Sequence, residues 1–525
     1  MALRVLMLGW EFPPFITGGL GTACHGLTKA LDRKQVDVTF VLPKTISGES
    51  ASHVTLVTPG AVVARNGEPH PVARTPAVPG NGAEGPPGVS SPVGVGGAPT
   101  PAPSADPPLA PDEARRWREI VEEFRSTRFV ELPTAFPGVY DAVSAEEPTA
   151  RIEETVRLMR SAGWSAERIR TLAKAGAFPA LPADPVERAI SLALPETADR
   201  PRDAQLARSA ESADYSGDLL GMADRYARFA TEATRGLEFD VIHAHDWLTY
   251  PAGLAIARLS GKPLLVHVHS TEFDRSGETP NQQVYNIERR GMHGATRVIA
   301  VSALTRNICV NRYGVTPGKI DVVYNGVDLD PAAAGIAPIH SKDKIVLYFG
   351  RITMQKGPEY FIQAAKKVLE YMDDVKFVVA GSGDQAQRMI EMAASMGIGN
   401  KVLFTGFLRG RDIARVFAMA DLYVMPSVSE PFGIAPLEAM SHNVPVLISK
   451  SSGVSEVLMH ALKVDFWDIE DMADKIVAVL RRPPLSRQLV EHGSFEIRGI
   501  NWDGAATRTV RCYERAIANA AGAGY

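Results

Sequence analysis

The chain has 525 residues and is 45% hydrophobic, which suffices for two domains with large buried cores. Its 56 Lys and Arg residues against 60 Asp and Glu residues give a net charge of −4 at pH 7, and no stretch is strongly basic, which argues against nucleic acid as the main partner. Three widely separated cysteines indicate reduced thiols, and no run of about 20 apolar residues is free of charges and helix breakers, so we expect a cytoplasmic protein without transmembrane segments.

Short β-branched runs alternate with helical patterns along the chain, which predicts parallel sheets with crossover helices. The strands expected in the first half are Arg4–Leu8, Val36–Leu42, Val241–Ala244, Pro263–His269, Arg297–Val301 and Ile320–Tyr324. Those expected in the second half are Ile345–Phe349, Val375–Ala380, Lys401–Thr405, Leu422–Met425 and Val444–Ile448. The almost continuously apolar strands indicate sheets buried on both faces. The fold class is therefore α/β, with two Rossmann-like, doubly wound domains.

The alternation of strands and helices is interrupted near Asp328–Lys344, which places the first domain at residues 1–335 and the second at 336–503. An insertion at about 58–212 interrupts the first domain, and its residues 58–111 are rich in Pro, Gly, Ala and Ser, a composition that predicts disorder. From Asp112 to about Arg235 the pattern becomes charged and helical. Residues 504–525 complete the chain with an amphipathic helix.

Two glycines follow the first expected strand, at the point where an α/β sheet normally holds its ligand. Gly18 and Gly19 would let the backbone approach a phosphate closely, beside the free N–H groups of a helix N-terminus. Glycine-rich turns are common, and a tight turn without a ligand explains the same residues.

Two cations follow the first strand of the second domain. Arg351 and Lys356 lie five residues apart between glycines, and an Arg fork with a Lys ammonium suits a diphosphate. A diphosphate leaving group gains negative charge as its bond to the sugar breaks, so fixed cations there lower the barrier. Two solvated surface cations are the alternative interpretation.

The stretch Glu430–Glu438 follows another strand and contains Pro431-Phe432-Gly433, a turn that should begin a helix. Such a turn leaves backbone N–H groups available to sugar hydroxyls. Glu438 falls within the helix, where its carboxylate could accept hydrogen bonds from both hydroxyls of a ribose. We interpret this stretch as a ligand-binding loop.

Two His-x-His pairs end neighbouring strands, His243 with His245 and His267 with His269. Residues i and i+2 of a strand share a face, so each pair could project together. Zinc binding is the rival hypothesis, although no matching Cys or carboxylate cluster follows the pairs. A neutral His269 pointing into an interdomain cleft, as a partner of a sugar hydroxyl, is the interpretation that we favour.

Two further patterns carry less weight. Asp328 and Asp330 have the Asp-x-Asp spacing of metal-dependent glycosyltransferases, but they lie in the expected interdomain segment and not at a nucleotide-binding strand end. Gly381 and Gly383 form a lone G-x-G that is too weak to indicate NAD.

Together these motifs resemble the glycogen and starch synthases and related retaining glycosyltransferases of families four and five. The resemblance covers about residues 1–45 and 215–520. It rests on Ser429–Gly433 with Glu438 (the Glu-x7-Glu signature), Gly350-Arg351, Lys356-Gly357, His243–Trp247, Asn325–Asp328, Trp10–Pro14 and His269–Gly277. It implies the GT-B fold, with the last helix crossing back onto the first domain.

The resemblance also implies roles for individual residues. Arg351 and Lys356 would hold the donor's diphosphate, and Glu438 its ribose. Glu430, with the backbone of Phe432, Gly433 and Ile434, would hold the transferred sugar. The remaining roles fall to the first domain: His269 beside the reacting centre, Asp246 on the acceptor side, and Gly18 and Gly19 near the phosphates.

The chain departs from the family at two places. The synthases carry a Lys-x-Gly-Gly-Leu loop, and Phe15 stands where that lysine is expected, which weakens the expectation of standard glycogen synthesis. Ser452-Gly453 replaces a common Gly-Gly pair.

The expected reaction is transfer of a sugar, glucose from ADP- or UDP-glucose, to an α-glucan-type acceptor with retention of configuration. Neither a cofactor nor a metal is expected, because the nucleotide sugar is a co-substrate and the two cations neutralise its diphosphate. The alternatives are a same-class transferase with a lipid, small-metabolite or other sugar acceptor, a nucleotide-sugar epimerase, and a zinc hydrolase.

Overall fold

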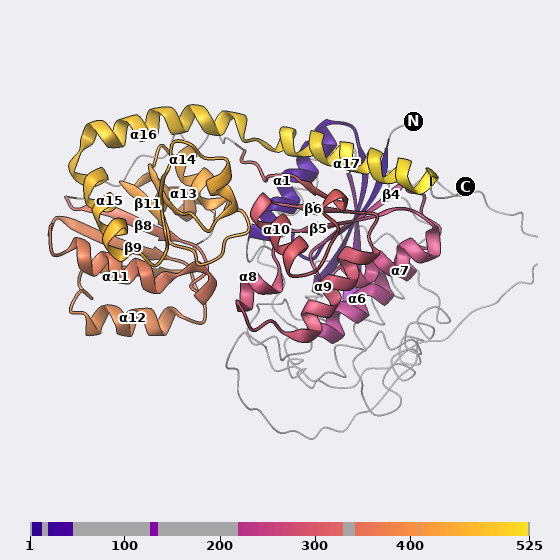
Figure 1. Ribbon diagram of the computed structural model, residues 1–525, viewed down its shortest axis with the longest axis horizontal. Helices are drawn as coiled ribbons and strands as arrows, with labels where there is room; N and C mark the ends of the chain where they lie inside the picture. Colours follow the sequence, from indigo (N-terminus) through magenta and orange to yellow (C-terminus); the bar gives the residue numbers. More distant parts are fainter. Residues whose placement is uncertain are drawn as a thin grey trace, which may run out of the picture.

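The computed structural model describes residues 3–12, 19–45, 127–134, 219–328, 342–408 and 410–522, and Figure 1 shows that they form two α/β units side by side. Each unit is built on a parallel sheet with helices on both faces. The GT-B architecture expected from the sequence is therefore present.

The first sheet has seven parallel strands in the order β3-β2-β1-β4-β5-β6-β7. Their bounds are Arg4–Leu8 (β1), Asp37–Thr45 (β2), Thr127–Thr134 (β3), Val241–His245 (β4), Leu264–Val268 (β5), Arg297–Ala300 (β6) and Ile320–Val322 (β7). The helices around it are Gly19–Arg33 (α1), Leu219–Ala233 (α6), Tyr250–Ser260 (α7), Glu272–Ser276 (α8), Gln282–Gly294 (α9) and Ala303–Asn311 (α10).

The second sheet repeats this topology with six strands in the order β10-β9-β8-β11-β12-β13. Their bounds are Lys344–Phe349 (β8), Val375–Ala380 (β9), Val402–Gly406 (β10), Leu422–Met425 (β11), Val446–Ser449 (β12) and Leu462–Val464 (β13). The helices of this unit are Pro358–Val368 (α11), Ala386–Ser395 (α12), Arg411–Ala418 (α13), Ala435–Ser441 (α14), Ile469–Arg481 (α15) and Pro483–Glu496 (α16). Because both sheets reverse their strand order beside the central strand, each has a ligand-binding crevice at its carboxyl edge.

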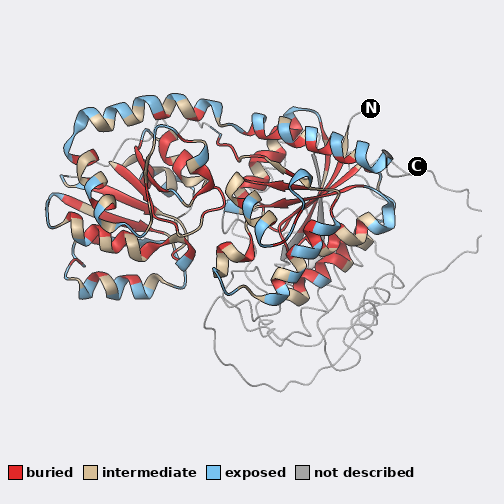
Figure 2. Ribbon diagram, viewed as in Figure 1, coloured by how far each residue is buried: buried red, intermediate tan, exposed pale blue. Residues whose placement is uncertain are grey.

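The apolar strands bury both of their faces. In β1, Leu6 and Leu8 join one core cluster, and Val5 and Met7 join the cluster on the other side of the sheet. Figure 2 shows the same burial in both units, with buried strands in red beneath helices whose outer faces are exposed.

The last helix, Trp502–Gly522 (α17), leaves the second unit and packs against α1 of the first. Its Trp502 and Tyr513 belong to the core cluster of the first sheet. Gly26 of α1 is essential to this contact, because a Cβ at that position would overlap the Trp502 indole.

The structure corrects the sequence analysis at two strands. Thr127–Thr134 was expected within a helical insertion, but it forms β3 at the edge of the first sheet, in parallel register with β2. The short strand β13 was not predicted. The residues expected to be disordered, 58–111, lie outside the described part of the chain, as do the other insertion residues except those of β3. No helix within the described ranges has the length and apolar character needed to cross a membrane.

Candidate active site

A cavity of about 180 Å³ opens between the two units, where the carboxyl ends of their strands face each other. It is lined by Trp10, Glu11, Gly19, Leu20, Leu219, Asp246, Trp247, Leu248, His269, Ser270, Arg275, Asn325, Arg351, Gln355, Lys356, Glu430, Pro431, Phe432, Gly433 and Ile434. Both units contribute polar groups to one site, which is the usual position of a substrate in a two-domain enzyme.

The loop after β8 supplies the cations of the second unit. Lys356 forms an ion pair with the buried carboxylate of Glu430, which also accepts a hydrogen bond from the Ser427 hydroxyl at 3.2 Å. Among the described residues, the Arg351 guanidinium has no carboxylate partner and remains available to an anion. Both cations line the cavity, and Lys356 is held by Glu430 in this structure.

Gln355 fixes this loop against the loop that carries Glu430. Its side-chain amide donates to the backbone carbonyl oxygen of Ser429 at 3.1 Å. The backbone carbonyl oxygen of Gln355 accepts from the Val428 N–H at 2.9 Å. Gln355 was not among the predicted site residues, because the contact between the two loops becomes visible only in the folded structure.

The Glu430 loop is held open toward the cavity by its backbone. Glu430 forms a parallel bridge with Ser452, and Gly433 has φ of 100°, which a side chain would strain. The helix α14 begins at Ala435, two residues later than the expected turn at Gly433. Phe432, Gly433 and Ile434 therefore line the cavity just before a helix N-terminus.

Glu438 lies in the first turn of α14 and is not among the residues that line the cavity. Burial raises the pKa of its carboxyl group to about 7. A carboxyl group with this pKa is poised to gain or lose a proton near neutral pH.

Asp246 occupies the end of β4 in the first unit, with a positive φ of 58° that is uncommon outside glycine. Its Oδ1 accepts hydrogen bonds from the backbone N–H groups of His269 at 2.7 Å and Ser270 at 3.3 Å. Burial raises the pKa of Asp246 to about 7. The carboxylate thus fixes the backbone that carries His269 at the cavity wall.

His269 is the outermost of four histidines that lie on one face of β4 and β5. Its Nε2 contacts Nδ1 of His245 at 2.8 Å, and Nε2 of His243 contacts Nδ1 of His267 at 3.2 Å. Burial lowers the pKa of His269 to about 3, so the imidazole that faces the cavity is neutral. The expected pairing within each His-x-His motif is present, and the two pairs also contact each other.

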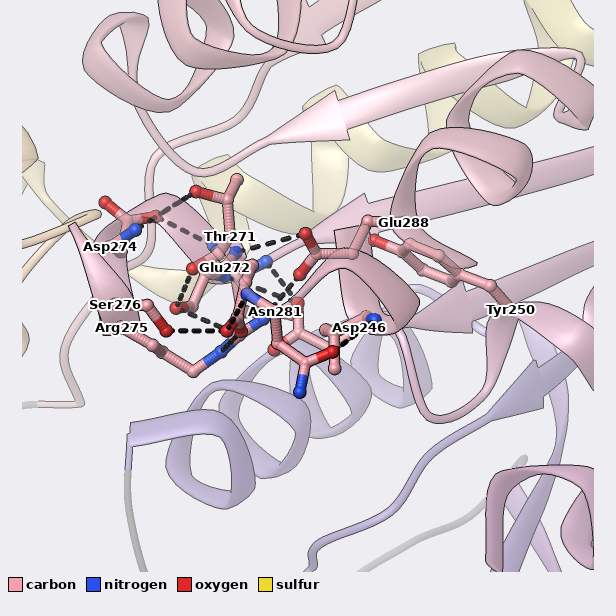
Figure 3. A network of polar contacts seen from close by, with 12 residues as sticks. Asp246, Tyr250, Thr271, Glu272, Asp274, Arg275, Ser276, Asn281 and Glu288 are labelled. Carbon is pink, nitrogen blue, oxygen red and sulfur yellow. Dashed lines mark hydrogen bonds and ion pairs between the residues drawn. The ribbon is translucent and has the colours of Figure 1, made fainter. Parts of the chain in front are cut away.

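A second polar network surrounds Arg275 of α8 (Figure 3). Its guanidinium contacts the buried carboxylates of Glu272 at 3.0 Å and Glu288 at 2.5 Å. It also donates to the Ser270 hydroxyl at 3.1 Å. The network rigidifies the wall of the cavity next to His269. Arg275 belongs to the His269–Gly277 stretch that carries the family resemblance, but its pairing with Glu288 was not expected, because Glu288 comes from a different helix.

Two contacts join the units beside the site. The Ser429 hydroxyl donates to Oδ1 of Asp274 at 2.6 Å, while the other oxygen of Asp274 accepts from the N–H and hydroxyl groups of Thr271. The carboxylate of Glu456 accepts from the first N–H groups of α10 and from the hydroxyl of Tyr324 at 2.9 Å. An anion at a helix N-terminus is favourable, so the Glu456 contact stabilises this arrangement of the units, and the Ser429–Asp274 hydrogen bond adds a second link.

The structure brings most of the predicted site residues to one cavity. Those that line it are Gly19, Asp246, His269, Arg351, Lys356, Glu430, Phe432, Gly433 and Ile434. Gly18 and Phe15 lie outside the described residues. Asp328 is exposed at the end of the first unit, and Asp330 is outside the described part.

Three family models match successive parts of the chain. "Starch synthase catalytic domain" matches residues 4–73, "Glycosyltransferase Family 4" residues 191–331, and "Glycosyl transferases group 1" residues 333–494. Among curated proteins, an uncharacterized glycosyltransferase of Methanocaldococcus jannaschii is 30% identical over 299 residues, which cover 53% of this chain and 76% of the relative. A D-inositol 3-phosphate glycosyltransferase of Pseudarthrobacter chlorophenolicus is 27% identical over 324 residues, covering 58% of this chain and 77% of the relative.

Among solved structures, sucrose-phosphate synthase from Thermosynechococcus elongatus superposes with a TM-score of 0.58 at 16% identity, covering 98% of this chain and 99% of that chain. This likeness concerns the fold. The enzyme class comes from the family models and the sequence relatives: the chain belongs to the GT-B glycosyltransferases, with family 4 and group 1 domains.

Proposed function

We propose that the chain is a retaining glycosyltransferase that transfers glucose from ADP- or UDP-glucose to a hydroxyl group of an α-glucan. One observation carries the proposal: Arg351, Lys356 and the Glu430 loop face Asp246 and His269 across a single cavity. A nucleotide sugar needs this combination, with cations for the diphosphate and neutral or hydrogen-bonding groups for the sugar.

The second unit holds the donor. Arg351 and Lys356 bind the diphosphate, which displaces Glu430 from Lys356 and frees that carboxylate to accept hydrogen bonds from the sugar's hydroxyls. Glu438 binds the ribose once its carboxyl group is ionised. The backbone from Phe432 to Ile434 completes the donor site, with Gly19 of the first unit lining the same cavity.

The first unit holds the acceptor side. Asp246 and the neutral His269 lie opposite the donor loop, and Asp246 keeps the His269 backbone in place. The neutral His269 forms a hydrogen bond with a hydroxyl group of the transferred sugar. Because it carries no positive charge, it does not oppose the positive charge that develops on the sugar ring in the transition state.

The chemistry is a front-face displacement. The bond between the anomeric carbon and the phosphate oxygen breaks, its electron pair stays on the phosphate, and the acceptor oxygen bonds to the same face of that carbon. The acceptor's proton passes to the departing phosphate. A double displacement needs a carboxylate placed to attack, whereas in this proposal the Glu430 carboxylate binds the sugar's hydroxyls and Asp246 is held by two backbone N–H groups. Catalysis then rests on positioning and on charge stabilisation.

A second acceptor class has its own support. Several curated relatives are D-inositol 3-phosphate glycosyltransferases, so a small phosphorylated polyol is the alternative acceptor for the same donor chemistry.

Product analysis tests the proposal. The purified protein is incubated with ADP- or UDP-glucose and either glycogen or inositol phosphate, and the new glycosidic linkage is assigned by NMR. An α-linked glucan extended by one glucose supports the proposal. An α-linked inositol product supports the second acceptor class, and a β-linkage contradicts the retaining mechanism.

A further inference from the structure

Four histidines and a cysteine lie together in the core of the first unit, behind the cavity wall. β4 and β5 are parallel neighbours with His245 opposite His267, so the two His-x-His pairs place all four imidazoles on one face of the sheet. The ring centroids of His243 and His245 are 4.2 Å apart, and those of His267 and His269 are 4.1 Å apart. Cys24 of α1 adds a thiol at the same place, which the sequence spacing could not reveal.

Two of these imidazoles have a buried nitrogen without a partner. Nε2 of His245 and Nε2 of His267 have no hydrogen bond, although the two residues are 0% and 2% exposed. A buried polar atom left without a partner costs about 1–3 kcal/mol. These two nitrogen atoms could each bind an additional atom placed between them and their surroundings.

The spacing suits a metal ion. One ligand nitrogen from each of His243, His245 and His267 lies within 4.8 Å of the other two, and a second set of this kind joins Cys24 to His245 and His269. Bonds of about 2.0 Å to zinc bring nitrogen ligands closer together than this limit, so small rotations of the rings complete the site.

The ligand chemistry selects the class of metal. Imidazoles bind zinc and neighbouring transition metals, whereas magnesium and calcium prefer oxygen ligands.

We propose that His243, His245 and His267 bind one zinc ion or similar divalent transition-metal ion in the core of the first unit. The three ligands are 0%, 0% and 2% exposed, so the ion lies in the core behind the cavity wall and away from bulk solvent. We assign it a structural role, which is unrelated to the zinc hydrolase considered from the sequence.

The metal has a consequence for the cavity that rests on the proposed function. A metal-bound imidazole keeps its other N–H to donate to a neighbour. With the metal on Nε2 of His245, its Nδ1–H donates to Nε2 of His269, the contact of 2.8 Å described above. His269 then carries its own proton on Nδ1, so the metal fixes the tautomer of the histidine that faces the sugar.

Metal content tests the site without reference to activity. Full-length protein is produced in zinc-supplemented medium, passed over a chelating resin and measured by ICP mass spectrometry. We expect about one zinc per chain in the wild type and in a control with His460→Asn and His492→Asn, which removes an exposed histidine pair with ring centroids 5.0 Å apart. We expect loss of the zinc in His267→Phe, with folding checked by circular dichroism.

Zinc X-ray absorption of the wild type keeps the proposal testable if the His267→Phe chain does not fold. Three or more imidazole nitrogens at about 2.0 Å support the buried site. The proposal is wrong if the wild type retains no stoichiometric zinc, if the surface double variant loses it, or if the ligands are mainly water oxygens.

Discussion

The hydrogen bond between Ser429 and Asp274 provides a sharp test of how the two units cooperate. The Ser429 hydroxyl donates to Oδ1 of Asp274 at 2.6 Å across the boundary between the units, and Ser429 is the residue next to Glu430. Asp274 is 3% exposed, and its other oxygen is occupied by Thr271. Ser429→Ala therefore removes a contact that holds the two units in this arrangement.

The expected effect follows from the charge on Asp274. A hydrogen bond to a charged group contributes about 1.5–3 kcal/mol, and every 1.4 kcal/mol is about tenfold. Ser429 is half-buried, so water replaces part of the lost bond and the lower end applies. We expect Ser429→Ala to lower kcat/KM for transfer about tenfold.

Binding of the nucleotide alone should not change, because Arg351, Lys356 and Glu438 all belong to the second unit. The assay compares initial rates of transfer with the Kd for UDP or ADP from calorimetry. Ser429→Thr, which keeps the hydroxyl, should restore most of the activity, and Ser395→Ala, whose hydroxyl bonds only within α12 at 2.8 Å, serves as the matched control. An unchanged transfer rate, or a loss of nucleotide affinity equal to the loss of transfer, would refute the reasoning.

Three further variants test the packing and the charges of the described residues. Arg275→Met leaves two buried carboxylates without their cation and should lower the free energy of unfolding in urea by about 3–5 kcal/mol. Arg388→Met, at an exposed ion pair, should change the free energy of unfolding by less than about 1 kcal/mol. Because the pKa of Glu438 is raised from 4.5 to about 7, the folded state binds more protons than the unfolded state in this window and loses stability as pH rises through it. Glu438→Gln should therefore raise Tm at pH 8 but not at pH 4, and an equal gain at both values would contradict the assignment. Gly26→Ala should lower Tm, because the added methyl group overlaps Trp502, the first residue of α17. Gly504→Ala, where the nearest atom is 3.5 Å from the added methyl group, should leave Tm unchanged or higher. Equal effects of the two variants would show that the α1–α17 contact tolerates the added volume.

Much of the fold could be predicted from the sequence because the strands are buried on both faces. A run such as Val5–Leu8 packs alternately into two cores and must be apolar throughout, which leaves an unambiguous pattern. The strand Thr127–Thr134 lacks that pattern and lies among charged, helical-looking residues, so only its register with β2 identifies it. The strand Leu462–Val464 has three residues, too few for a periodic signal.

The site residues could be predicted from the sequence where a charged residue stands beside glycine or proline in the loop that follows a strand. Arg351, Lys356 and Glu430 stand beside such residues, and the structure places them around one cavity. Gln355, the thiol of Cys24 and the pairing of Arg275 with Glu288 were missed, because each depends on contacts between different elements of the fold. The pairing of Ser429 with Asp274 spans 155 residues and leaves no local trace.

The most direct test of the account is release of nucleotide from a panel of nucleotide sugars by the wild type and by Arg351→Ala, with and without acceptor. Arg351 supplies a charge to the leaving diphosphate, and loss of one such group typically costs about 10²- to 10³-fold in kcat. The account predicts release from ADP- or UDP-glucose that rises with acceptor in the wild type and falls by about this factor in the variant. Undiminished turnover of every tested nucleotide sugar by Arg351→Ala would contradict it.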